Sequence, residues 1–322
     1  MLPTIDDIRA AAARIRGHAV RTPLLASPVL DAHTGGRVLL KPETLQRTGS
    51  FKFRGAVNRI ALIPQAERGK GVVAFSSGNH AQGVAAAAGV FGMKAVIVMP
   101  ADAPRAKLEG TRSLGAEIVT YDRQTEDREA IAARVLAERG GTLIKPFDDA
   151  QLIAGQGTVG LEILEDAGAR GVRVDQLLVP CGGGGLTAGI ALAVGDAAKV
   201  YSVEPQNFNG MRRSLDAGAP VKAPATPVSV ADSLMSPQPG AIPFAVAGPL
   251  LAGGLTVTDE DLLAAVSFAL CRLKLVVEPG GAAALAALLA GKLEARDRTT
   301  VLVLSGGNAD FAVLAGAVSR FA

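Results

Sequence analysis

The 322-residue sequence has little of what several classes of protein require. Two cysteines are too few for a disulfide framework, so we expect a reduced, cytoplasmic protein. The longest uninterrupted apolar run, Ala282 to Ala290, has nine residues, whereas a membrane-spanning helix needs about 20. No secretory leader is visible at the start of the chain. The net charge is only +3, from 33 Lys and Arg against 30 Asp and Glu, which gives no reason to expect a nucleic-acid or membrane partner.

Glycine, in contrast, is abundant: the chain has 38, about 12% of its residues, against a usual share of about 7%. Seven short β-branched or leucine-rich runs, with no regular polar alternation, are separated by alanine-rich helical stretches. This pattern predicts an α/β fold whose mostly parallel sheets have helices on both faces. The runs are Val38–Leu40, Val72–Phe75, Ala95–Met99, Glu117–Thr120, Gln176–Val179, Val200–Val203 and Val301–Leu304.

Several of the glycines directly follow predicted strands. Three runs end in turns that contain glycine and precede a probable helix. Ligands of open parallel sheets bind beyond the carboxyl ends of the strands, so the three turns predict one ligand site. The turns are Ser76-Ser77-Gly78-Asn79-His80, Pro180-Cys181-Gly182-Gly183-Gly184-Gly185 and Ser305-Gly306-Gly307-Asn308.

The four consecutive glycines Gly182, Gly183, Gly184 and Gly185 precede a helix expected over Leu186–Ala193. Glycines at this position let backbone N–H groups and the positive end of a helix dipole surround an anion. The alternative is a flexible surface loop, but a glycine run between a buried strand and a helix has a high entropic cost. We therefore predict a phosphate-binding loop.

The same loop also fits a different cofactor. Gly183, Gly185 and Ala188 match G-x-G-x-x-A, and Glu204 follows 21 residues after Gly183 at the end of a predicted strand. This is the outline of a dinucleotide-binding motif with its ribose-binding acid. A nicotinamide-dependent dehydrogenase is therefore an alternative, although this motif leaves the other two glycine turns unexplained.

Lys52 stands between Phe51 and Phe53, near the start of a probable helix. In an apolar cleft, desolvation would disfavour its ammonium form and leave a nucleophilic amine that can form a Schiff base. The alternative is an exposed helix lysine with its charge in solvent.

The segment from Lys41 to Ala56, which contains Lys52, resembles the cofactor-lysine motif of the serine/threonine dehydratase and serine racemase family, pyridoxal phosphate enzymes of fold type II. Three further motifs of that family are matched in the same order, and the resemblance covers the chain from about residue 5 to its end. The matching segments are Lys41 to Ala56, Ser76-Ser77-Gly78-Asn79-His80-Ala81-Gln82-Gly83, Gly182 to Gly185 and Ser305-Gly306-Gly307-Asn308.

The resemblance implies pyridoxal 5'-phosphate as the cofactor. Lys52 would bind it as a Schiff base and move the substrate Cα proton, while the glycine loop and the Leu186 amide would hold its phosphate. Asn79 would hydrogen-bond the 3' oxygen, and Ser305 would meet the pyridine nitrogen. The implied cofactor-binding residues are Phe51, Lys52, Asn79, Gly182, Gly183, Gly184, Gly185, Leu186 and Ser305.

The turn after the second predicted strand is expected to bind the substrate carboxylate through its amides and short hydroxyls. Ser77 resembles the second base of the racemases, and racemisation needs proton transfer on both faces of Cα. Alternatively, Ser77 only helps to bind the carboxylate. The implied substrate-binding residues in this turn are Ser76, Ser77, Gly78, Asn79 and His80.

Two more positions are compared with the racemase-like pattern. Arg128, near the start of a helix expected over Thr125–Arg139, aligns with an arginine that faces substrate in those relatives, where it could bind a second carboxylate. Otherwise it is a surface residue on a charged helix. Glu204 matches one carboxylate of a divalent-cation site, but the second position is Gly210, so we predict no metal site.

The resemblance implies a large cofactor-binding domain from residues 1–69 and 149–322, and a small inserted α/β domain at 70–148 that closes over the substrate. The activity it implies is that of an ammonia-lyase, a dehydratase that converts a β-hydroxy-α-amino acid such as L-threonine or L-serine to a 2-oxo acid and ammonia. Serine or aspartate racemisation and dehydration of hydroxyaspartate or an aryl-serine are alternatives on the same site. A homodimer is expected from the family alone.

Overall fold

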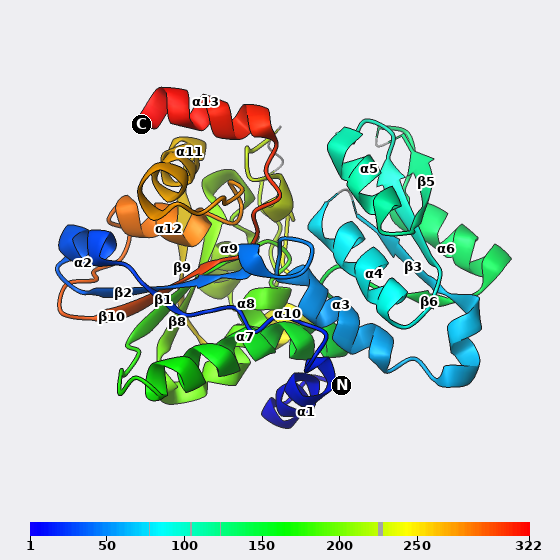
Figure 1. Ribbon diagram of the computed structural model, residues 1–322, viewed down its shortest axis with the longest axis horizontal. Coiled ribbons are helices and arrows are strands. Elements are labelled where there is room, and N and C mark those ends of the chain that lie inside the picture. The colour runs from blue at the N-terminus through cyan, green and yellow to red at the C-terminus, as the bar shows by residue number, and fades with distance from the viewer. Residues whose placement is uncertain (77, 104, 123, 225–227) are drawn as a thin grey trace.

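The computed structural model describes residues 1–76, 78–103, 105–122, 124–224 and 228–322. The described chain forms two α/β units that lie side by side, each built around its own sheet (Figure 1). The predicted α/β class with mostly parallel sheets is confirmed. No helix in these ranges is both long and apolar enough to cross a membrane.

The larger sheet has six strands, and its neighbouring strands are parallel except for the first pair. In spatial order the strands are β1 (Leu25–Ala26), β2 (Arg37–Pro42), β10 (Thr299–Leu304), β7 (Gln176–Pro180), β8 (Lys199–Pro205) and β9 (Leu251–Val257). Alternate residues of β10 face opposite helix layers: Leu302 and Leu304 one, Val301 and Val303 the other.

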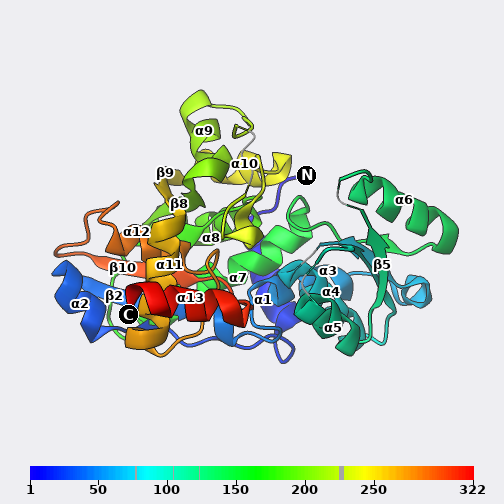
Figure 2. The same ribbon diagram turned by 90° about the horizontal axis from the view of Figure 1, so that it is seen from above.

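Helices cover both faces of this sheet, as Figures 1 and 2 show. One layer contains α2 (Pro28–Thr34), α11 (Asp259–Phe268), α12 (Ala283–Leu289) and α13 (Phe311–Phe321). The other contains α7 (Ala150–Gly168) and α8 (Gly185–Val194), with α1 (Ile5–Ile15) and α10 (Ala241–Ala247) packed outside them and α9 (Gly210–Ala217) beside β8 and β9.

The smaller sheet is entirely parallel, with the strand order β5 (Glu117–Tyr121), β4 (Ala95–Pro100), β3 (Val72–Phe75) and β6 (Thr142–Leu143). Its faces are covered by α3 (Lys52–Ala61), α4 (Asn79–Val90) and α5 (Arg105–Ser113) on one side and α6 (Arg128–Arg139) on the other. Helix α3 also packs against α7, so it joins the two units. The four strands all fall within the segment 70–148 predicted as an inserted domain.

All seven predicted runs form strands. Three strands were not predicted: β1 and β6 have only two residues each, and β9 contains the pair Gly253-Gly254, which breaks the β-branched pattern. Helix α6 begins at Arg128 rather than at Thr125, because the Asp127 side chain caps it by accepting from the N–H groups of Glu129 and Ala130.

Candidate active site

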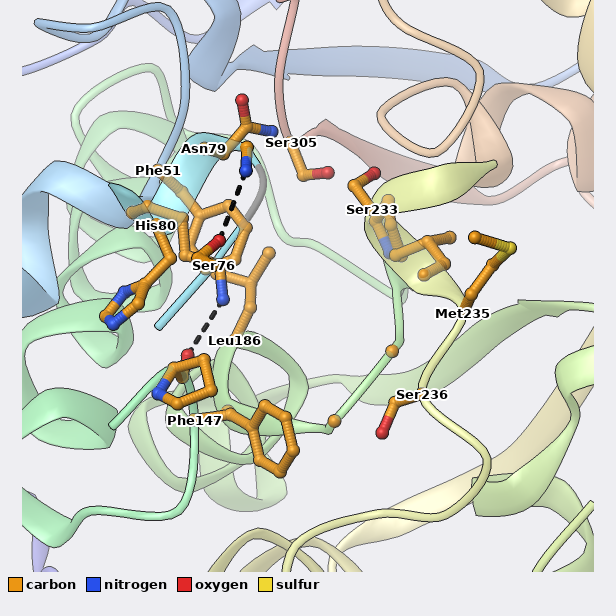
Figure 3. A pocket seen from close by; sticks show the side chains of 18 of the residues that line it. Phe51, Ser76, Asn79, His80, Phe147, Leu186, Ser233, Met235, Ser236 and Ser305 are labelled. Atoms are coloured by element: carbon orange, nitrogen blue, oxygen red, sulfur yellow. Dashed lines mark hydrogen bonds between the residues drawn. The ribbon is translucent and has the colours of Figure 1, made fainter. Parts of the chain in front are cut away.

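A pocket lies where the carboxyl ends of β3, β7 and β10 meet (Figure 3). Residues of all three predicted glycine turns line it together with Lys52, and Asn79 and Ser305 lie at one end with Phe147 at the other. Ser77 lies outside the described residues. The other predicted site residues line the pocket: Phe51, Lys52, Ser76, Gly78, Asn79, His80, Arg128, Gly182, Gly183, Gly184, Gly185, Leu186 and Ser305.

Lys52 is the first residue of α3, and its backbone is held close to the end of β10. Phe51 N–H donates to the Ser305 carbonyl at 3.1 Å, and Ser50 pairs with Gly306 in an isolated bridge. Lys52 Nζ donates to the Pro146 carbonyl at 2.8 Å and lies 5.2 Å from the centre of the Phe51 ring. Burial lowers the pKa of Lys52 to about 8, although the negative charge of Glu278 acts to raise it. The structure therefore gives Lys52 the desolvated environment that the flanking phenylalanines suggested.

Packing and backbone conformation in this structure both favour glycine in the loop before α8. A Cβ at Gly183 would lie 2.3 Å from the Phe147 ring, and Gly184 has a φ of +88°. Helix α8 begins directly after, at Gly185, so its free N–H groups face a stretch without side chains. This is a cradle for an anion of the size of phosphate.

Asn79 and Ser305 are both almost fully buried, at 9% and 4% exposure. Asn79 Nδ2 donates to Glu278 Oε1 at 2.5 Å. Glu278 also lines the pocket, and burial raises its pKa to about 7. The sequence reasoning missed Glu278; the available signal was a single carboxylate in the apolar stretch between Leu275 and Ala290.

The β3–α4 turn presents polar groups to the same pocket. Gly78 N–H donates to Ser76 Oγ at 3.2 Å. His80 Nε2 lies 2.9 Å from the Ile144 carbonyl, and burial together with the Lys52 charge lowers the pKa of His80 to about 3. The imidazole is therefore neutral and donates through Nε2. Its buried Nδ1 has no partner among the described residues.

Two cations line the mouth of the pocket. The Arg128 guanidinium lies over the Phe75 ring, 5.4 Å from its centre. Lys107 of α5 forms an ion pair with Asp232, which belongs to the segment that lines the opposite wall. Sequence reasoning missed Lys107 and Phe147, because nothing in their local sequence distinguishes them from surface or core residues.

Glu204 is buried, and its hydrogen bonds are made to backbone N–H groups of α9. Its two oxygens accept from the N–H groups of Met211 and Arg212 at 2.7 and 2.8 Å, at the start of α9. Burial raises its pKa to about 8. The carboxylate thus caps a helix, whereas the dehydrogenase alternative requires it to bind a ribose. Gly210 is tightly packed, since a Cβ there would lie 2.8 Å from Gln238 Cα.

Comparison with known proteins shows which family the chain resembles over most of its length. The family model described as pyridoxal-phosphate dependent enzyme matches residues 15–306. The chain is 44% identical over 312 residues to an L-threo-3-hydroxyaspartate ammonia-lyase from Pseudomonas sp, with 96% of each chain covered.

Solved structures show the same fold. A threonine deaminase from T.th. superposes with a TM-score of 0.89 at 46% identity, covering 96% of this chain and 99% of the other. A maize serine racemase superposes with a TM-score of 0.92 at 35% identity, covering 99% and 98%.

Proposed function

This chain belongs to the pyridoxal-phosphate dependent enzyme family, and we propose that it is an ammonia-lyase that converts a β-hydroxy-α-amino acid to a 2-oxo acid and ammonia. The observation that carries the proposal is Lys52, an amine with a pKa lowered to about 8, in one pocket with the glycine loop and Ser305. A desolvated lysine amine acts both as nucleophile and as base near neutral pH.

The residues of the pocket fit pyridoxal phosphate. The glycine loop and the Leu186 N–H would hold the phosphate at the start of α8, where the loop glycines contribute no side chains of their own. Lys52 would bind the cofactor covalently through Nζ, with Phe51 packed beside it, and Asn79 would donate to the ring oxygen. Pyridoxal phosphate, when bound, withdraws electrons from the substrate Cα and makes its proton acidic.

Ser305 favours elimination over transamination. We propose that its hydroxyl meets the pyridine nitrogen, at the buried end of the pocket beside Asn79. A neutral hydroxyl, unlike a carboxylate, does not keep that nitrogen protonated, so negative charge at Cα is stabilised less. Loss of the β-hydroxyl soon after Cα deprotonation is then the easier course.

The remaining residues would orient the substrate and move its proton. Lys52 Nζ takes the Cα proton, and the β3–α4 turn binds the α-carboxylate through its amides, Ser76 and the neutral His80. We propose that the segment 70–148 acts as a small domain that closes on the rest of the chain and excludes water. The Lys107–Asp232 ion pair joins these two parts across the pocket mouth and supports this proposal.

Dehydration of 3-hydroxyaspartate is the second candidate. Arg128 places a guanidinium in the pocket lining, which suits a substrate with a second carboxylate, whereas the nearby Lys107 is already paired with Asp232. One relative, 44% identical, is named for that activity. Racemisation would need a base on the second face of Cα; Ser77 is the proposed residue, and a similar structure is that of a serine racemase.

The test is a direct one. Protein purified with pyridoxal phosphate should show a visible absorbance band, and Lys52→Ala should abolish both the covalent band and the release of 2-oxo acid. Lys199→Ala, at an exposed lysine, is the matched control and should retain both. A wild-type protein that stays colourless with added cofactor would exclude the proposal.

A substrate panel then separates the candidates. Serine, threonine, L-threo-3-hydroxyaspartate and an aryl-serine would be compared by kcat/KM for 2-oxo acid release, and unreacted substrate by chiral analysis. Arg128→Ala should affect hydroxyaspartate more than threonine. We also propose that the protein is cytoplasmic and forms a homodimer. Size-exclusion chromatography with light scattering would test the oligomeric state.

A further inference from the structure

Asn79 is the middle member of a chain of hydrogen bonds in the pocket wall. Asn308 Nδ2 donates to the Thr48 carbonyl at 2.7 Å and to Asn79 Oδ1 at 2.8 Å. Asn79 Nδ2 donates in turn to Glu278 Oε1 at 2.5 Å. The chain therefore connects the loop before α3, the loop after β10, the start of α4 and the segment before α12.

The direction of this chain is fixed at Thr48. A backbone carbonyl can only accept, so Asn308 must present its amide nitrogen there. That nitrogen also faces Asn79, which must offer its oxygen to Asn308 and its nitrogen to Glu278. The opposite orientation of either amide would place two donors or two acceptors against each other, and such mismatched buried groups are costly.

Glu278 closes the other end of the chain. It is 3% exposed, and its N–H donates to the Gly306 carbonyl at 3.0 Å. A Cβ at Gly306 would lie 2.5 Å from Glu278 Oε1 and 3.1 Å from Asn79 Nδ2. The turn after β10 thus has glycine at 306 because the contact between Asn79 and Glu278 occupies the space of a side chain.

We propose that Glu278 and Asn308 are positioning residues that hold the Asn79 amide with its second N–H directed into the pocket, toward the ring oxygen of pyridoxal phosphate. The amide nitrogen carries two hydrogens, and Glu278 accepts one of them. Neither positioning residue touches the reacting atoms; both act through Asn79. The inference rests on the role proposed for Asn79 in the function above.

The experiment uses the holoenzyme and two measurements besides turnover: the ratio of the visible to the near-ultraviolet absorbance of the bound cofactor, and its release rate on dilution. Glu278→Leu removes the acceptor, and Asn308→Asp replaces the NH2 group that donates both hydrogen bonds with an acceptor oxygen. Each should change the absorbance ratio and speed cofactor release about tenfold, the effect of losing roughly one hydrogen bond. Glu278→Gln should stay within about threefold of wild type, because its Oε1 still accepts from Asn79 while the Ser233 hydroxyl turns to accept.

Two controls separate a positioning role from loss of folding. Asp310→Asn changes the same loop two residues after Asn308 but keeps the cap on α13, where Asp310 accepts from Ala312 N–H at 2.8 Å, and should leave both measurements unchanged. A double-mutant cycle combines Glu278→Leu with Asn79→Ala. If Glu278 acts through Asn79, the double variant should release cofactor no faster than Asn79→Ala alone.

The outcomes distinguish the positioning role of Glu278 and Asn308 from the proposed function of the enzyme. Two results would overturn the positioning role and leave the proposed function intact. One is that the effects of Asn79→Ala and Glu278→Leu on cofactor release simply multiply in the double variant. The other is that the Glu278→Leu and Asn308→Asp holoenzymes keep wild-type spectra and release rates. If Asn79→Ala itself changes neither measurement while Lys52→Ala still abolishes the band, the inference fails together with the role of Asn79, but the enzyme class stands.

Discussion

Two groups of buried or half-buried ionisable residues lie near the start of α3 and differ in how their charges are matched. The first, which we call the paired cluster, consists of Lys41, Glu43, Arg54 and Glu162. The second, which we call the pocket group, consists of Lys52, His80 and Glu278. Lys52 and Arg54 are only two residues apart, yet one belongs to each group.

In the paired cluster each charge has an opposite charge in direct contact. Arg54 binds Glu43 through Nε at 2.7 Å and through a second nitrogen at 2.8 Å, and it binds Glu162 at 2.7 Å. Burial alone would raise the pKa of Glu43, but the adjacent Arg54 holds it below its usual value. The pKa of Arg54 is raised by the same two carboxylates, despite its burial. Glu43 and Arg54 therefore stay charged, although burial lowers the pKa of Lys41 in spite of its contact with Glu162.

In the pocket group burial prevails instead. Burial lowers the pKa of Lys52 to about 8 and that of His80 to about 3, and it raises the pKa of Glu278 to about 7. Each shift favours the neutral form of the side chain. Groups that are buried with incomplete pairing exchange protons near neutral pH more readily than paired ones. The charges that Arg54 of α3 matches keep their ionised forms, whereas the unmatched Lys52 amine on the same helix is suited to chemistry.

Breaking the paired cluster should have the largest effect on stability. Arg54→Met leaves two carboxylates, Glu43 and Glu162, without their main partner, and Glu43 is fully buried. We expect the free energy of unfolding to fall by about 3–5 kcal/mol, measured by urea denaturation. The control is Arg139→Ala, which breaks an exposed ion pair with Glu117 and should lower the free energy of unfolding far less. Equal losses in the two variants would contradict the distinction between the cluster and a surface pair.

Removing the charge of Glu278 should change how stability depends on pH. Its pKa is about 7 in the folded protein against 4.5 for an ordinary glutamate, so the folded state binds this proton more tightly. Its contribution to stability is therefore present below pH 4.5 and is lost as the pH rises from about 4.5 to about 7. Glu278→Gln should remove this loss, making the cofactor-free variant more stable relative to wild type at pH 8 than at pH 5 by about 1–3 kcal/mol.

The charged groups that face Glu278 are Asp232, Lys107 and Lys52. His80 lowers stability of both proteins below about pH 6.5 in the same way, so it cancels in the difference between variant and wild type. Urea denaturation at the two pH values measures the effect. A constant stability difference from pH 5 to pH 8 would show that Glu278 already ionises normally in the folded protein.

The pocket could be predicted from sequence only where its chemistry is local. Lys52 and the glycine turns stand in short segments that each carry their own signal, such as four glycines between a strand and a helix. Glu278, Lys107 and Phe147 reach the same pocket through contacts between residues far apart in the chain, for example Asn79 with Glu278. A single sequence holds no record of such contacts. Ser77 was predicted from its turn and lies outside the described residues.

The strands, too, could be predicted only where their signal is local in the sequence. The strands of the sheet interiors were predicted because they are buried on both faces and read as continuous apolar runs. Strand β9 was missed because it contains Gly253 and Gly254, and a Cβ at Gly254 would lie 3.0 Å from Arg212 of α9. Its strand conformation is imposed by pairing with β8, which is a tertiary effect.

The smallest expected effect, and the most local one, concerns the packing that places Lys52. A Cβ at Gly83 of α4 would lie 3.2 Å from the Lys52 carbonyl carbon and the Phe53 nitrogen, whereas one at Gly89 of the same helix would meet nothing within 4 Å. Gly89→Ala should raise the free energy of unfolding by about 0.5–1 kcal/mol, because alanine is the better helix former. Gly83→Ala should show no such gain and should lower kcat severalfold, since the start of α3 must move by a few tenths of an ångström to accept the methyl group. Thermal unfolding and single-turnover kinetics measure the two effects. If both variants gained stability and kept wild-type kcat, packing against α4 would not set the position of the Lys52 amine. Lys52 and Arg54 would then differ only in how their charges are paired.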